Sequence, residues 1–81
     1  MGIKSQKIVG KEIIVEIEST NLKTIKYNTE DKNLQVTFNN NSIYEYSEVP
    51  WNTFSQLRLS ESQGKFFNTE IKSKFAFKKI Q

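Results

Sequence analysis

Hydrophobic and polar residues alternate along much of the first fifty residues, which is the pattern of β-strands that bury one face. The alternation is cleanest at Leu34, Val36 and Phe38. We expect strands over four ranges: residues 11–18, 22–28, 34–38 and 42–49. The polar residues 28–33 and the asparagines at 39–41 predict turns between strands, because asparagine adopts a positive φ at low cost.

The second half of the chain changes to a helical spacing. Apolar residues recur at a helical interval in a first candidate helix: Trp51, Phe54 and Leu57. Pro50 can occupy the first position of that helix. Ser60 and Gln63 have the spacing of a capping box and predict the start of a second helix. Residues 75–80 alternate again and predict a last strand.

A run of strands followed by helices indicates an α+β domain with its helices on one face of a sheet. We therefore expect an antiparallel β-meander of three to five strands with one or two helices packed on one face. The chain has 81 residues, so we expect a single domain over residues 11–81. Residues 1–10 are polar and contain two glycines, which predicts a flexible arm or an edge strand.

The composition leaves few groups for catalysis. The chain contains no cysteine and no histidine, so it lacks disulfides, thiolate nucleophiles and the commonest metal ligand. We expect no enzyme activity, no cofactor and no metal site. No apolar run of about 18 residues occurs, and the first residues lack the apolar core of a signal peptide. We therefore expect a cytoplasmic location and no membrane partner.

The net charge of +3 is concentrated at one end of the chain. Residues 1–62 hold seven basic and eight acidic side chains, whereas residues 63–81 hold five lysines against Glu70 alone. These lysines are interleaved with phenylalanines. Such a mixture suits single-stranded nucleic acid, because lysines neutralise phosphates and aromatic faces stack on bases. In the alternative interpretation, the phenylalanines belong to the core and the lysines form a solvated face.

An ordered set of short motifs resembles the KTSC family, over about residues 19–80. The set consists of Ser19-Thr20-Asn21-Leu22, Ile25-Lys26-Tyr27, Tyr44-Glu45-Tyr46 with Val49-Pro50, Gly64-Lys65-Phe66-Phe67-Asn68, Ile71-Lys72, and Phe75 with Phe77. The chain departs from the family pattern at Asn41, where glycine is usual, and at Lys72, where arginine is frequent. The family is named for its occurrence at the C-terminus of some lysyl-tRNA synthetases, and the resemblance implies a suggested role in RNA binding.

The candidate residues for binding a nucleic acid or another ligand are Tyr44, Tyr46, Gly64, Lys65, Phe66, Asn68, Lys72, Lys74, Phe75, Lys78 and Lys79. Tyr44 and Tyr46 share one strand face, where they would stack on bases or pack under a helix. Gly64 falls in the first turn of the second helix. There it would help free N–H groups to bind an anion, or it would let the helix pack closely on the sheet.

These features favour a non-catalytic binding module for a phosphate-bearing ligand, with RNA or another oligonucleotide as the first choice. Five lysines on single-stranded phosphates would give a slope of about −3.5 for log affinity against log salt. The alternative is a protein-interaction module, or a phage or mobile-element accessory protein, that binds a host protein or sequesters a small nucleotide signal. In that case residues 11–18 would form an edge strand through which two copies pair as a homo-oligomer.

Overall fold

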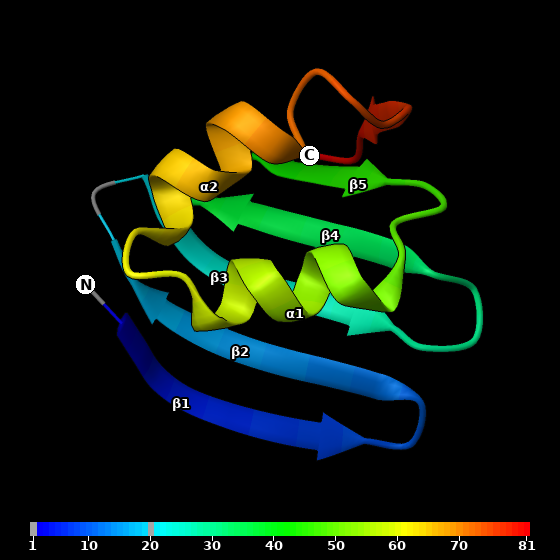
Figure 1. Cartoon of the computed structure of the whole chain (residues 1–81), viewed down its shortest axis with the longest axis horizontal. Coiled ribbons are helices and arrows are strands. Elements are labelled where there is room, and N and C mark those ends of the chain that lie inside the picture. The colour runs from blue at the N-terminus through cyan, green and yellow to red at the C-terminus, as the bar shows by residue number, and fades with distance from the viewer. Residues whose placement is uncertain (1, 20) are drawn as a thin grey trace.

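The computed structural model describes residues 2–19 and 21–81, so Met1 and Thr20, which belongs to the first resemblance motif, lie outside it. Six strands form one antiparallel sheet in which neighbours in the sheet are also neighbours in the chain (Figure 1). The strands are β1 (Gly2–Val9), β2 (Glu12–Glu18), β3 (Leu22–Asn28), β4 (Asn33–Phe38), β5 (Ile43–Tyr46) and β6 (Phe77–Lys79).

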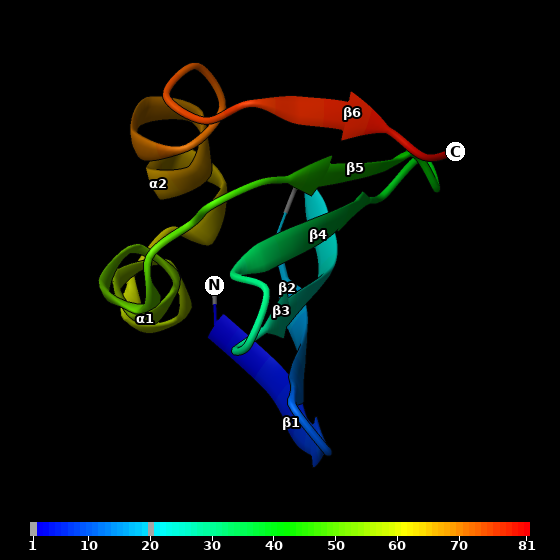
Figure 2. The ribbon, with the colours of Figure 1, turned by 90° about the vertical axis from the view of Figure 1, so that its right-hand side faces the viewer.

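Two helices, α1 (Trp51–Leu59) and α2 (Gln63–Glu70), connect β5 to β6. Figure 2 shows both helices on the same side of the sheet, with the other face uncovered. The predicted α+β class, with a meander and helices on one face, is therefore confirmed. The sheet reaches six strands because the segments near both ends of the chain, β1 and β6, pair with it.

Strand β2 lies in the interior of the sheet. Its residues pair with β1 on one side, from Glu18 opposite Gly2 to Glu12 opposite Val9, and with β3 on the other side. The segment expected to offer a free edge for a second copy is therefore paired on both sides. Among the described strands, the open edges of the sheet belong to β1 and β6.

Both helices begin one or more residues later than the sequence predicted. Pro50 has an extended backbone and is the residue before α1 rather than its first residue. Ser62, not Ser60, caps α2, and its hydroxyl accepts a hydrogen bond from the backbone N–H of Lys65. Ser60 instead ends α1, and the amide of Gln63 donates to the carbonyl of Arg58. The predicted capping box is wrong because its glutamine is buried between the helices.

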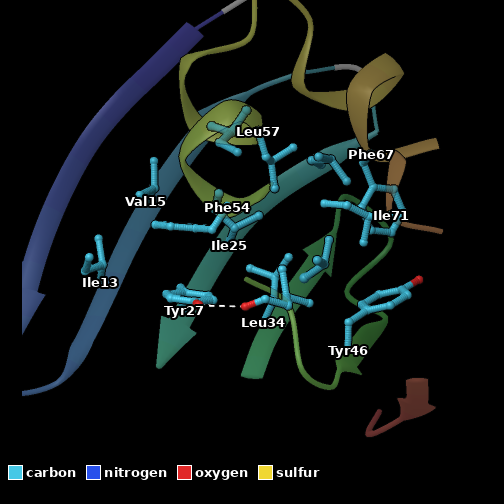
Figure 3. Packing of buried hydrophobic residues seen from close by; sticks show 14 residues of the cluster. Ile13, Val15, Ile25, Tyr27, Leu34, Tyr46, Phe54, Leu57, Phe67 and Ile71 are labelled. Carbon is cyan, nitrogen blue, oxygen red and sulfur yellow. Dashed lines mark hydrogen bonds between the residues drawn. The ribbon is translucent and has the colours of Figure 1, made fainter. Parts of the chain in front are cut away.

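The core lies between the sheet and the two helices (Figure 3). Tyr27 on β3 stacks on Phe54 of α1, with ring centroids 4.5 Å apart and ring planes 8° apart. The hydroxyl of Tyr27 donates a 2.6 Å hydrogen bond to the carbonyl of Val49, which ties the start of α1 to the sheet. Phe67 and Ile71 fill the space under α2 and are almost fully buried. Strand alternation and helical spacing therefore converge on one apolar layer.

Asparagine closes the β4–β5 connection, as predicted. Asn41 has a φ of 71°, and its backbone N–H donates to the carbonyl of Phe38. This backbone conformation costs Asn41 little, because asparagine tolerates the left-handed region better than most residues. The turn brings the two residues before Asn41 to the end of the sheet that α2 overlies.

Candidate functional site

A groove lies between α2 and the end of the sheet where β4 turns into β5. It consists of two adjoining pockets of about 430 and 390 Å³. Both pockets are lined by Phe38, Asn40, Asn68 and Lys72. One half also contains Asn21 and Asn39, and the other contains Tyr44 and Phe77. We call this site the amide–aromatic groove.

Side-chain amides form one wall of the groove. Asn39 and Asn40 come from the β4–β5 turn, and Asn68 comes from α2. The Oδ1 atom of Asn40 accepts a 3.0 Å hydrogen bond from the backbone N–H of Ser42. The Nδ2 atom of Asn39 donates a 3.0 Å hydrogen bond to the carbonyl of Ser19. Two of these amides are therefore held in defined orientations, that of Asn40 by its own turn and that of Asn39 by the β2–β3 connection.

Aromatic rings form the other half of the groove. Tyr44 lies between Phe38 and Phe77, with centroid distances of 5.6 and 5.7 Å. Beneath them, Tyr46 and Phe67 are buried and pack edge to face. Phe77 keeps 54% of its surface exposed, so part of its ring is free to contact a ligand. Burial raises the pKa of Tyr46, and the nearby Tyr44 raises it further, so Tyr46 stays neutral at physiological pH.

Among the residues that the structure describes, Lys72 is the lysine that lines the groove. The backbone N–H of Lys72 donates to the carbonyl of Phe67, which wraps the chain around the end of α2. This contact fixes the backbone of Lys72 next to Asn68 and places its side chain in both halves of the groove. The side chain of Lys72 is exposed, so it can move to meet an anion.

The five predicted lysines do not form one surface. Lys79 pairs with Tyr44 in the β5–β6 ladder and shares its face, whereas Lys78 pairs with Glu45 on the opposite face. Lys78 also forms an ion pair with Glu45, at 3.5 Å. Lys74 pairs with Glu70 one turn earlier in the chain, at 3.1 Å. Lys65 lines a separate depression between the helices.

Three other predicted residues lie outside the groove. Phe66 and Phe75 are half buried against the core, and neither lines either half of the groove. Gly64 is buried, and a Cβ at its position would lie 3.2 Å from Oγ of Ser19. This close approach supports the packing interpretation of Gly64. Tyr46 belongs to the core as well, so of the predicted aromatic residues the half-buried Tyr44 is the one that borders the groove outside the core.

Asn21, Phe38, Asn39 and Asn40 were not among the predicted site residues. Asn39 and Asn40 were interpreted as turn residues, Asn21 as a turn or bulge residue with a ligand role as the alternative, and Phe38 as one position of an alternating strand. Phe77 was noted among the interleaved phenylalanines but was not chosen. In the part of the chain that the structure describes, no three acidic side chains gather to hold a metal ion, and no helix has the length and apolar character to cross a membrane.

The fold and groove define a small α+β domain with a single sheet, two helices on one face and a mixed amide and aromatic site. Residues 18–75 match the KTSC domain family, so the chain belongs to that family. A KTSC domain protein of Yersinia pestis has the same fold, with a TM-score of 0.82 and 27% identity, covering 86% of this chain and 99% of that one.

Similar sequences occur in two settings. A lysine–tRNA ligase of Nostoc punctiforme is 31% identical over 67 residues, which is 83% of this chain but 12% of the ligase. An uncharacterized protein of Stutzerimonas stutzeri is 31% identical over 58 residues, which is 72% of this chain and 82% of that protein. The chain thus spans about an eighth of the length of the ligase that it matches.

The family match covers most of the groove. Residues 18–75 include the amide wall, Lys72, Phe38 and Tyr44, whereas Phe77 on β6 lies beyond the match. Strand β1 and nearly all of β2 lie before it. The amide wall therefore belongs to the family segment, while one aromatic wall comes from a strand next to that segment.

Proposed function

We propose that this chain is a non-catalytic module that binds single-stranded RNA or a similar oligonucleotide in the amide–aromatic groove. The observation that carries the proposal is the meeting of accessible aromatic rings, oriented amides and one lysine in a single groove. These are the three kinds of group that contact the faces, the edges and the phosphates of unpaired nucleotides.

The aromatic half supplies the surface on which a base stacks. Tyr44 and Phe77 flank an opening of about 390 Å³, within the range of small-molecule sites. Stacking of one base on an aromatic ring contributes roughly 1–3 kcal/mol by alanine substitution. Duplex RNA cannot use this surface, because its bases stay stacked on each other. We therefore expect binding to favour single strands.

The distribution of the lysines lowers the expected contribution of charge. Lys72 lines the groove and Lys79 shares the face of Tyr44, whereas Lys74 and Lys78 pair with glutamates elsewhere. One or two phosphate contacts give a slope of about −0.7 to −1.4 for log affinity against log salt on a single strand. This replaces the slope expected for five lysines, so stacking and hydrogen bonds must supply most of the affinity.

The relatives support an RNA ligand over other polyanions. A lysine–tRNA ligase is, by its name, a protein that acts on a tRNA, and a segment similar to this chain occurs within it. The absence of cysteine and histidine agrees with a binding role, because the common nucleophiles and proton carriers are missing.

Fluorescence anisotropy tests the proposal with a labelled single-stranded RNA of about ten nucleotides, which is a typical site size for a small module. The same sequence in a duplex and a free mononucleotide serve as comparison ligands. Phe77→Leu keeps an apolar side chain but removes the ring, and Phe77→Tyr keeps the ring. We expect the leucine variant to bind about tenfold more weakly and the tyrosine variant to bind as the wild type does.

Lys72→Ala and Lys65→Ala form a matched pair, because Lys65 on α2 is exposed like Lys72 but lies outside the groove. We expect only the Lys72 variant to weaken binding. If no nucleic acid binds, the proposal is wrong. If the mononucleotide alone binds as tightly as the oligonucleotide, the ligand is a small nucleotide rather than RNA.

A further inference from the structure

We infer that the open edge of β1, together with the flank of α1 beside it, binds an extended acidic segment of a partner protein, which adds to the sheet as a further strand. We call this site the edge surface. It consists of residues 5–9 of β1 with Trp51 and Arg58 of α1. The edge surface lies at the opposite end of the strand order from β5 and β6, so the inference goes beyond the proposed function of the amide–aromatic groove.

The edge of β1 is long enough to receive another strand. β1 has eight residues, whereas β6 at the other edge of the sheet has three. A bulge between Ile3 and Ser5 leaves residues 5–9 in regular pairing with β2. Figure 1 shows β1 at the edge of the sheet, with α1 over the strands inward of it. The backbone groups of β1 that point away from β2 therefore have no partner strand, and an extended peptide can pair with such an edge.

Apolar side chains remain exposed on both sides of this edge surface. Ile8 lies opposite Ile13 of β2, and Ile13 lies opposite Tyr27 of β3, so the three side chains form a row on the helix-covered face. Trp51 packs on Tyr27, with ring centroids 6.0 Å apart. Ile13 and Tyr27 are buried, but Ile8 is 66% exposed and Trp51 is 45% exposed. An apolar side chain of an added strand would cover part of this exposed surface.

Arg58 joins the helix to the edge strand and has no counter-charge. Its Cζ atom lies 5.8 Å from the centroid of the Trp51 ring, and its Nη1 atom donates a 3.2 Å hydrogen bond to Oε1 of Gln6. Gln6 and Ile8 are two residues apart on β1, so they share a face. The ion pairs of the described residues do not include Arg58, and its Nε atom has no hydrogen-bond partner. A carboxylate on an added strand would supply the missing negative charge.

Charge also favours an acidic partner over a second copy of this chain. β1 contains two lysines and no acidic residue. Pairing two copies of β1 would bring these lysines together, and like charges on paired strands are destabilising. Lysines on an edge strand commonly protect it from such self-pairing. An acidic strand would meet the same lysines as opposite charges, so the edge distinguishes between the two partners.

The geometry favours a peptide over a nucleic acid at this surface. An open strand edge offers N–H and C=O groups at the spacing of another strand, which is the spacing of a peptide backbone. One face of the Trp51 ring is already covered by Arg58 and is not free for a base. In addition, β1 lies before the segment that matches the family, whereas α1 lies inside it. The edge surface is therefore not contained in the family segment alone.

Fluorescence anisotropy with two labelled synthetic peptides tests the inference on the complete chain. The acidic probe is a nonapeptide with threonine at the odd positions and with glutamate and valine by turns at the even positions, so that glutamate and valine share one face of the strand. The basic probe has lysine in place of glutamate. We expect the acidic probe to bind at least about tenfold more tightly, because a charge-assisted contact with Arg58 replaces a repulsion.

Methylation of the peptide backbone distinguishes strand addition from other modes of docking. Successive N–H groups of a strand point to opposite sides, so only one of two neighbouring central residues donates to β1. N-methylation of that residue should weaken binding at least about tenfold, and N-methylation of its neighbour should weaken it less than about threefold. Equal losses from the two methylated peptides would overturn strand addition.

Arg58→Gln removes the charge, and Lys7→Gln is the matched control. Lys7 is exposed on the same edge strand, but it lies opposite Ile14, on the other face from Gln6 and Ile8. We expect Arg58→Gln to reduce the preference for the acidic probe to below about threefold and Lys7→Gln to keep most of it. A preference that survives Arg58→Gln would overturn the role of Arg58. The peptide comparisons use the wild-type chain, so they decide the inference even if Arg58→Gln is unstable.

Two further outcomes separate the inference from the proposed function. Absence of binding by the acidic probe would overturn the inference and leave RNA binding in the groove unaffected. Displacement of the bound probe by single-stranded RNA would assign the edge surface to nucleic acid and overturn the peptide partner. We expect RNA and the acidic probe to bind together, and we expect Arg58→Gln to leave the RNA affinity unchanged.

Discussion

Phe77 and Tyr46 lie opposite each other in the β5–β6 ladder, with ring centroids 5.4 Å apart, yet 54% of Phe77 is exposed and only 2% of Tyr46 is exposed. The difference arises because β6 is the last strand of the sheet, while Tyr46 is covered by Phe67 from α2. Phe77 therefore has one side against the protein and part of its ring free. This is the arrangement that a stacking surface requires.

The difference in burial predicts a difference in stability effects. Phe67→Ala removes a fully buried ring and should lower the free energy of unfolding by about 3–5 kcal/mol. Phe77→Ala removes a half-exposed ring and should lower it by about 1 kcal/mol. Urea denaturation followed by circular dichroism measures both. Equal losses in the two variants would show that Phe77 serves the core rather than the groove.

The different positions of Lys72 and Lys78 predict different salt responses. Lys78 pairs with Glu45 on the uncovered face, whereas Lys72 lines the groove. Lys72→Ala should reduce the magnitude of the slope of log affinity against log salt by about 0.7, because one phosphate contact is lost. Lys78→Ala should leave the slope unchanged. RNA affinities measured at several salt concentrations give both slopes. A smaller slope for Lys78→Ala than for the wild type would place the RNA on the uncovered face.

The fold class and the order of most elements could be predicted from the sequence because the buried positions follow local periods, whereas the sheet has six strands rather than the three to five expected. Alternation identified the strand around Leu34 and Val36, and a helical interval identified α1 through Phe54 and Leu57. The start of α2 was predicted at the wrong serine. Ser60 and Gln63 have the spacing of a capping box, but the side chain of Gln63 makes a different hydrogen bond. Its amide turns to the carbonyl of Arg58, a contact that no local pattern reveals.

The groove was harder to predict because its walls are distant in the chain. Asn40 and Lys72 meet only after the helices fold back over the sheet. Asparagines in a connection look like turn residues, and Asn40 is one, since its carbonyl oxygen stabilises the turn. Its free amide nitrogen has no sequence signature. By contrast, the separation of Lys78 from Lys79 onto two faces follows from strand alternation alone.

The contact between α2 and the β2–β3 connection can be tested with a double-mutant cycle. Alanine at position 64 favours the helix by up to about 1 kcal/mol, but its Cβ would lie 3.2 Å from Oγ of Ser19. Gly64→Ala alone should therefore leave the stability nearly unchanged or lower it. Ser19→Ala removes the obstructing oxygen, and also a hydrogen bond from the N–H of Asn21.

We expect the double variant to be more stable than the sum of the single changes by about 1 kcal/mol, because the steric conflict exists only when both groups are present. Chemical denaturation of the four proteins measures this coupling. Additive effects would mean that the side chain of Ser19 moves away at no cost and that the approach of α2 does not depend on glycine.

The buried hydroxyl of Tyr27 predicts a loss of stability at alkaline pH. Burial raises the pKa of Tyr27 above its ordinary value of 10.0, and its hydroxyl donates to the carbonyl of Val49. As the pH rises past about 10, the unfolded chain releases this proton first, so the free energy of unfolding falls with pH. The stabilisation from neutral Tyr27 is complete below that pH and is lost as the pH rises through the pKa of the folded protein.

Tyr27→Phe isolates this contribution. Without the hydroxyl, the carbonyl of Val49 loses its partner, and the protein should be less stable at neutral pH by about 1 kcal/mol. The variant should then lose less further stability than the wild type between about pH 8 and pH 11, because one titrating group is missing. Tyr46, whose pKa burial also raises, should account for part of the decline that remains. Urea unfolding across this pH range measures both curves, and parallel curves for the two proteins would show that Tyr27 ionises as readily in the folded state as in the unfolded one.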